Sequence, residues 1–160
     1  DRFVGDGILN RIRRKVHLER RGMAQSELMD EVVRFKGSSE KGAVLFAVMG
    51  GRVSEGIDFP DRELEAAIVA GIPYPKPTAK QRALLHYYEV KFGRGWEYTV
   101  KAPVTRKLLQ AIGRLIRTET DVGVAVVLDR RAGQFSDRLD VVSTEIVVND
   151  VLNFFARRGR

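Results

Sequence analysis

The chain contains no cysteine among its 160 residues. This absence excludes disulfides, thiolate zinc sites and cysteine-held iron–sulfur clusters within these residues, and it fits a reducing compartment. No apolar run approaches the roughly 20 residues that a membrane-spanning helix needs. The first residue is not methionine, and we expect the chain to be a fragment of a longer protein.

Several common catalytic signatures are also missing. His17 and His86 have no ligand-like spacing to each other or to carboxylates, so we expect no metal site. No Gly-x-Ser-x-Gly segment marks a serine nucleophile. Residues 37–42 have the glycine spacing of a phosphate-binding loop, but Ala43 and Val44 follow where Lys and Ser or Thr are needed. We interpret this segment as an ordinary loop.

Positive charge is concentrated in one part of the chain. The formal net charge is +7. Residues 76–131 carry 12 cationic and five anionic side chains, so their surplus equals the net charge of the whole chain. A local basic surface favours nucleic acid or nucleotide as the partner.

The hydrophobic pattern predicts one α/β domain. Short apolar runs, typical of buried strands, lie at 15–18, 43–48, 66–70 and 122–128. They alternate with amphipathic segments, typical of helices, at 3–12, 25–35, 78–92, 103–118 and 147–155. This order indicates a mostly parallel sheet with helices on both faces.

Local signals add detail to this fold. Thr78 and Gln81 have the spacing of a capping box at the start of the helix expected over 78–92. Residues 93–96, which follow this helix, are expected to form a flexible tip. The last helix is expected to turn four apolar side chains inward, namely Val148, Val151, Leu152 and Phe155.

The segment 110–117 is the most informative stretch. On a helix, Gln110, Arg114 and Arg117 lie within roughly 60° of one another, opposite an apolar face. No acidic residue occurs from Pro103 to Thr118, so within this stretch the cations of this face have no acidic i,i+4 partner. A solvated surface helix is one interpretation. Binding of an external anion, above all phosphate, is the other.

Two loops, 50–58 and 129–131, follow apolar runs and are expected at the carboxyl edge of the sheet, where α/β domains bind ligands. In the first, glycines let backbone N–H groups approach phosphate, and Ser54 and Asp58 offer a hydroxyl and a carboxylate. A strand–helix turn with Asp58 as a cap explains the same residues. At this edge, Arg52 and Arg131 suit contacts with backbone phosphates.

Trp96 is the only tryptophan and directly follows the segment Gly93-Arg94-Gly95. It is either a packed anchor or a platform on which a base of single-stranded nucleic acid stacks.

These residues together resemble the XPD family of superfamily 2 DNA helicases, with archaeal XPD proteins the most similar. Residues 51–59 resemble motif V and residues 110–117 resemble motif VI, while 71–74 and 129–131 also match the family. The resemblance covers residues 20 to 138 in the right order and spacing.

The resemblance implies a RecA-like fold, with the chain as the second of two motor domains and a strand missing before Phe3. ATP and Mg²⁺ would lie in a cleft shared with the first domain, which carries the phosphate loop and, in full-length family members only, an iron–sulfur cluster. The full-length protein would be a 5′→3′ helicase of nucleotide excision repair, cytoplasmic in a prokaryote and nuclear in a eukaryote. The 160 residues alone, a monomer, would be inactive.

The resemblance also implies roles for individual residues. Catalytic roles toward the γ-phosphate fall to Gln110, Arg114 and Arg117. Nucleotide contacts fall to Gly56, Asp58 and Gly113, and single-stranded DNA contacts to Arg52, Ser54, Trp96 and Arg131. Two other functions stay open: a non-catalytic nucleic-acid-binding α/β module, and a subunit that senses nucleotide without a partner domain.

Overall fold

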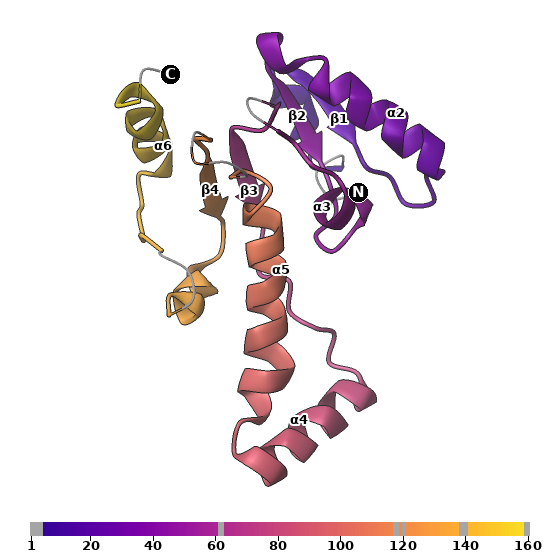
Figure 1. Cartoon of the computed structure of the whole chain (residues 1–160), viewed down its shortest axis with the longest axis vertical. Helices are drawn as coiled ribbons and strands as arrows, with labels where there is room; N and C mark the ends of the chain where they lie inside the picture. Colours follow the sequence, from indigo (N-terminus) through magenta and orange to yellow (C-terminus); the bar gives the residue numbers. More distant parts are fainter. Residues whose placement is uncertain (1–4, 61–62, 117–118, 120, 138–140, 159–160) are drawn as a thin grey trace. The chain divides into compact units, whose positions relative to one another are not determined.

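The computed structural model describes residues 5–60, 63–116, 119, 121–137 and 141–158 (Figure 1). The chain divides into two compact units, Asp1–Leu64 and Glu65–Arg160. Each unit contains one pair of hydrogen-bonded parallel strands. The predicted α/β class with parallel strands is therefore confirmed.

In the first unit, β1 (Lys15–Leu18) pairs with β2 (Ala43–Phe46), with Lys15 opposite Ala43. The helix α2 (Gln25–Lys36) lies along this pair (Figure 1). Its apolar stripe packs against the chain that follows β2, so that one core joins both segments. The buried members of this core are Leu28, Val32, Phe35, Val53, Ile57 and Phe59.

A buried histidine links the strand to the helix in this unit. His17 of β1 is 1% exposed, and its Nδ1 lies 2.9 Å from Oε1 of Glu31 on α2. The Arg34 guanidinium donates to the same carboxylate at 2.6 Å and, more than His17 does, lowers the pKa of Glu31. His17 is therefore a structural residue of the core.

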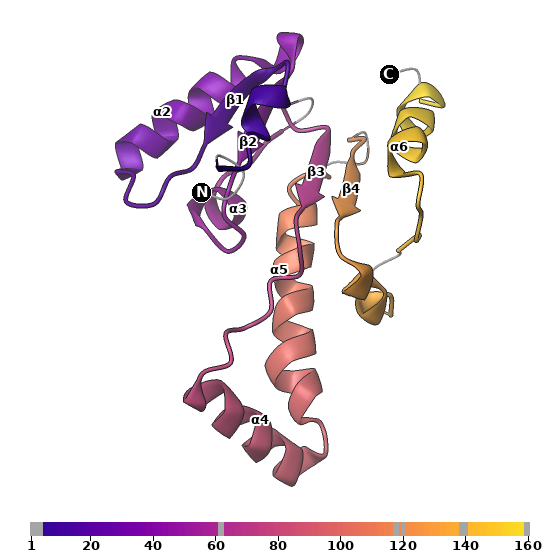
Figure 2. The same ribbon diagram turned by 180° about the vertical axis from the view of Figure 1, so that it is seen from behind.

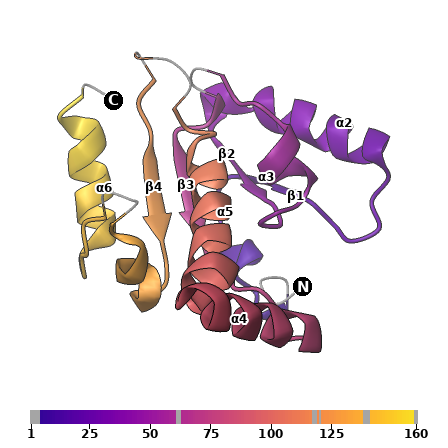
Figure 3. The same cartoon turned by 60° about the horizontal axis from the view of Figure 1, so that its bottom comes forward.

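In the second unit, β3 (Ala66–Val69) pairs with β4 (Val124–Val127), with Ala66 opposite Val124. Between them the chain forms α4 (Ala79–Phe92), a π-helical turn η4 (Glu97–Lys101) and α5 (Ala102–Ile112). Figures 1 and 2 show α5 running back from α4 towards the strands. The 3-10 helix η5 (Arg130–Phe135) follows β4, and α6 (Val147–Ala156) lies beside β4 (Figure 3).

The predicted continuous helix over 103–118 is wrong, because α5 ends at Ile112. Gly113 is its C-cap, and the next backbone bonds are of the tighter i→i+3 type, from Arg114 N to Ala111 O (3.4 Å) and Leu115 N to Ile112 O (2.9 Å). Glycine costs about 1 kcal/mol in a helix interior, which favours an end there. Arg114 therefore lies in a turn, and Arg117 and Thr118 lie outside the described residues.

The predicted flexible tip at 93–96 is also wrong. Gly93 ends α4 in the left-handed conformation (φ +64°), as its place after the helix predicts. Gly95 is buried, and its N–H donates to the Glu89 carboxylate at 2.7 Å. A Cβ at Gly95 would overlap the Leu85 carbonyl oxygen, so glycine lets the two helices approach closely.

Two further predictions need correction. Thr78 caps α4, since its Oγ1 accepts from Gln81 N at 3.2 Å, but the Gln81 side chain donates to Thr99 O at 2.8 Å and does not complete a capping box. On α6, Val148 and Leu152 are 67% and 62% exposed, so they do not face the core of this unit.

None of the helices in the described parts of the chain combines the length and the apolar character needed to cross a membrane.

Candidate functional site

The segment that resembles motif V forms a tight turn and a short helix after β2. Gly50 has a φ of +76°, and a Cβ at Gly51 would lie only 2.8 Å from the Val48 carbonyl oxygen. The helix α3 (Arg52–Gly56) begins directly after this turn. The Ser54 hydroxyl lies 3.1 Å from the carbonyl oxygens of both Val48 and Gly51, which closes the turn. The glycines are thus needed for local geometry.

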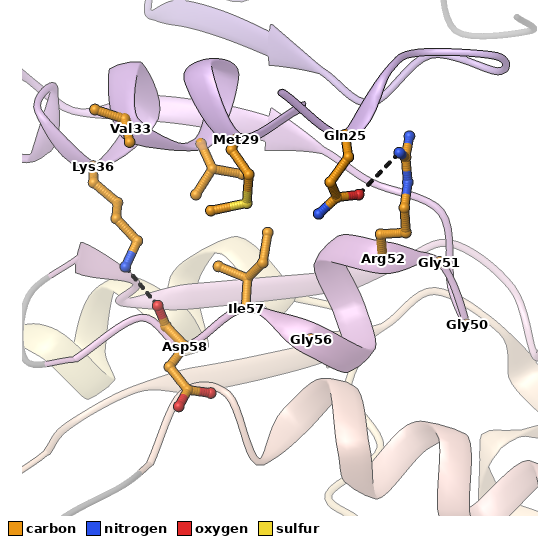
Figure 4. Close-up of a pocket in the computed structure, with 11 residues that line it drawn as sticks. Gln25, Met29, Val33, Lys36, Gly50, Gly51, Arg52, Gly56, Ile57 and Asp58 are labelled. Carbon is orange, nitrogen blue, oxygen red and sulfur yellow. Dashed lines mark hydrogen bonds between the residues drawn. The ribbon is translucent and has the colours of Figure 1, made fainter. Parts of the chain in front are cut away.

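Side chains of α2 hold this segment at two points. Arg52 donates from Nη1 to the Gln25 amide oxygen (3.1 Å) and from Nη2 to the Met23 carbonyl (2.9 Å). Lys36 donates to the carbonyl oxygen of Asp58 at 2.6 Å (Figure 4). A pocket of about 720 Å³ lies between α2 and α3, with an apolar floor that includes Met29, Val33 and Ile57.

Buried and exposed residues alternate along the segment. Val53, Ile57 and Phe59 are 4%, 8% and 4% exposed and belong to the core. Ser54 is half-buried, whereas the other predicted contact residues of this segment, Arg52, Gly56 and Asp58, are exposed. The core residues therefore fix the backbone and bring the four predicted positions together on one stretch of surface.

The segment that resembles motif VI lies at the end of α5 in the second unit. Gln110 is exposed on the last turn of the helix, and Gly113 follows as its exposed C-cap. Arg114 is half-buried. Leu108 and Leu115, which are 0% and 3% exposed, anchor the backbone on both sides of these residues.

Trp96 is separated from the motif VI residues by the length of a helix. It is 41% exposed and precedes η4, so a rise of 1.5 Å per residue puts it roughly 20 Å from Gln110. Its exposure is compatible with either a packed anchor or a stacking platform.

Arg131 is held in place by Asp129 and Tyr74. Its Nε and Nη2 donate to the two carboxylate oxygens of Asp129 at 2.9 and 2.6 Å. Its guanidinium carbon lies 4.9 Å from the centre of the Tyr74 ring. The side chain is nevertheless 56% exposed, so the group is oriented and still accessible.

Sequence reasoning missed the structural role of Asp129. Besides binding the Arg131 side chain, it caps η5 by accepting from Arg131 N (2.9 Å), and it accepts from Ile72 N (3.1 Å) just after β3. The Arg131 side-chain hydrogen bonds are the largest of the causes that hold the pKa of Asp129 well below its usual range. An Asp directly before a helical turn is a signal for such a cap.

The Asp129→Asn variant is expected to lower the melting temperature at pH 6, with a smaller loss below about pH 4. A carboxylate whose pKa is depressed by folding stabilises the protein above its unfolded pKa, near 3.9. That stabilisation is lost as the pH falls through the folded pKa. Thermal melts followed by circular dichroism at pH 6 to pH 3 measure the difference. A difference independent of pH would contradict a role for the charge.

No cluster of three or more His, Cys, Asp or Glu side chains that could hold a metal ion occurs in the part of the chain that the structure describes.

Comparison with known proteins supplies the context for these segments. The helicase C-terminal domain family matches residues 8–140, which include both motif-like segments. The ATP-dependent DNA helicase chl-1 of Caenorhabditis elegans is 37% identical over 135 residues, covering 82% of this chain and 16% of that protein. A probable ATP-dependent helicase of Methanocaldococcus jannaschii is 28% identical over 164 residues, covering 90% and 24%.

The fold of a solved protein agrees with these matches. The structure of XPD in its apo form superposes with a TM-score of 0.63 at 23% identity, covering 90% of this chain and 30% of that one. This chain spans only 16% and 24% of the lengths of the two relatives above. The chain belongs to the helicase C-terminal domain family.

Proposed function

We propose that residues 1–160 are the second RecA-like motor domain of an ATP-dependent 5′→3′ DNA helicase that acts in nucleotide excision repair. The observation that carries the proposal is the family match over residues 8–140, which includes both motif-like segments in the expected order. The name of the Caenorhabditis elegans relative, an ATP-dependent DNA helicase, supports the activity.

In this proposal, Gln110, Arg114 and Arg117 act on the γ-phosphate of ATP, which the first motor domain binds together with Mg²⁺. The half-buried Arg114 follows a capped helix and precedes the buried Leu115, so its backbone is fixed before ATP binds. A guanidinium on a fixed backbone suits an arginine finger, which stabilises charge on the transferring phosphoryl group.

Nucleotide contacts are assigned to Gly56, Asp58 and Gly113. The first two are exposed directly beside the buried Ile57, and a Cβ at Gly56 would meet no other atom within 4 Å. Open space at a glycine lets a ligand approach the backbone closely. The Asp58 carboxylate is suited to accept a hydrogen bond from a ribose hydroxyl.

Single-stranded DNA is assigned to Arg52, Ser54, Trp96 and Arg131. A guanidinium has five N–H donors, and Arg52 donates one from each terminal nitrogen within its own unit, which leaves donors for a phosphate. Arg131 is accessible and already oriented by Asp129. The exposed Trp96 ring offers a face for stacking, worth roughly 1–3 kcal/mol per base.

The purified 160-residue chain is expected to show no appreciable ATP turnover, because it lacks a phosphate loop. A coupled assay of phosphate release, with and without single-stranded DNA, measures this. The full-length protein assayed in parallel serves as the positive control. Turnover by the chain alone that Arg114→Ala abolishes would refute the requirement for a first domain.

A further inference from the structure

Lys36, the last residue of α2, makes three contacts through its ammonium group. The ammonium group of Lys36 donates to the Asp58 carbonyl oxygen at 2.6 Å and lies 2.7 Å from Oε2 of Glu63. It also lies 5.1 Å from the centre of the Phe59 ring. These three partners follow α3, so Lys36 connects α2 with the end of the motif V segment.

The surroundings keep Lys36 in this position. Its side chain is 26% exposed, and the neighbouring Phe35 packs edge-to-face on Phe59 with ring centres 5.8 Å apart. Oε2 of Glu63 is buried and has no well-oriented hydrogen bond within the described structure, so Lys36 supplies the positive charge nearest to it. The Glu63 side chain is 29% exposed, but its inward-facing oxygen has little access to water, so pairing with Lys36 is favourable there and helps to hold the lysine in place.

The rest of the segment is anchored by residues other than Lys36. Its beginning is held by Glu19, whose Oε2 accepts from Val48 N at 2.9 Å, and its middle by the contact of Arg52 with Gln25. At the end of the segment, the Asp58 carbonyl is held by Lys36. Figure 4 shows the Asp58 carboxylate on the opposite side of the main chain from Lys36.

The carbonyl and the side chain of Asp58 are attached to the same Cα, so the Lys36 contact with the carbonyl restrains the backbone from which the carboxylate extends. We propose that Lys36 is a positioning residue that orients Asp58 towards nucleotide. This inference rests on the proposed function, which assigns a nucleotide contact to Asp58. Lys36 itself touches no nucleotide in this account.

Steady-state ATP hydrolysis by the full-length protein, at saturating single-stranded DNA, tests the inference. Lys36→Met, which keeps the aliphatic stem but cannot donate, is expected to raise the KM for ATP about tenfold, within the roughly 100-fold that a 1 Å misplacement can cost. Lys36→Arg should restore the KM to within about twofold, because a guanidinium can donate to the carbonyl and pair with Glu63. Lys41→Met, an exposed site in the same unit, controls for the lost charge.

A double-mutant cycle separates positioning from general destabilisation. In an Asp58→Ala background, Lys36→Met is expected to have no further effect on the KM for ATP. An equal effect in both backgrounds, or a wild-type KM for Lys36→Met when Asp58→Ala raises it, overturns the inference. An unchanged KM for Asp58→Ala alone instead overturns the proposed nucleotide contact. Should Lys36→Met fail to fold, the pair Lys36→Met and Glu63→Gln, which leaves no carboxylate without its cation, carries the same prediction.

Discussion

Replacing Arg114 by alanine in the full-length protein is expected to lower the kcat of ATP hydrolysis by about 10³- to 10⁵-fold. Losses of this size are typical when an arginine finger is removed from a phosphoryl-transfer site. The fold should survive, because the turn at Arg114 is held by backbone bonds at Ala111 and Ile112 and by the buried Leu115. Phosphate release measures kcat, and circular dichroism verifies the fold.

Arg106→Ala is the matched control for this variant. Arg106 is an exposed cation on α5, outside the motif VI segment, so its loss removes the same charge without touching the proposed site. Its kcat should stay within about twofold of wild type, since isolated surface cations contribute little. An Arg114→Ala enzyme that retains a tenth or more of the wild-type kcat would contradict the assignment of a finger.

Phe135→Ala is expected to lower the free energy of unfolding of the second unit by about 3–5 kcal/mol, the usual range for emptying a buried phenylalanine site. Phe135 is 0% exposed, and its ring centre lies 6.3 Å from that of Tyr74. The Arg131 guanidinium packs on the same Tyr74 ring. Removing the Phe135 ring should therefore also make the positions of Tyr74 and the Arg131 side chain less well defined. Hydrogen exchange of peptides from 124–135 in the full-length protein measures the opening free energy.

Phe92→Ala provides the comparison for Phe135→Ala with the same change of side chain. Phe92 is 50% exposed and stacks on Tyr88 with ring centres 5.9 Å apart, so only part of its surface is removed from water. Its ring also packs edge-to-face on Tyr98 with ring centres 5.8 Å apart, so its loss should cost about 1–3 kcal/mol, the range for two aromatic pairs. Equal losses for the two variants would contradict the place given to Phe135 in the core.

Several elements that local signals specify were predicted correctly, although the helix expected over 3–12 is wrong because its described part contains a turn and the 3-10 helix η1 (Leu9–Arg11). The strands β2, β3 and β4 consist of aliphatic residues apart from Phe46, and they form parallel pairs as expected. Gly93 ends α4 where its position predicts. The end of α5 was missed because the apolar spacing continues beyond Gly113, and periodicity alone does not reveal a change from α to i→i+3 bonding.

Contacts between residues far apart in sequence were not predictable. Lys36 and Asp58 are 22 residues apart, and Asp129 and Ile72 are 57 apart, so their pairing depends on the packing of whole elements. Periodicity likewise identifies an apolar face on α6 but not what it faces, and Val148 is exposed. The predicted roles of Gln110, Arg114, Gly56 and Asp58 depend on ligands and remain predictions.

The affinity of the full-length protein for single-stranded DNA, with and without a non-hydrolysable ATP analogue, tests the central claim most directly. The claim is that motif VI acts on ATP, which couples nucleotide and DNA binding. We expect the Kd for DNA to differ between the two states by about 5- to 150-fold, the usual range of such coupling. This difference should disappear in Arg114→Ala. A salt-dependent Kd that is identical in both nucleotide states would contradict the claim and favour a non-catalytic nucleic-acid-binding module.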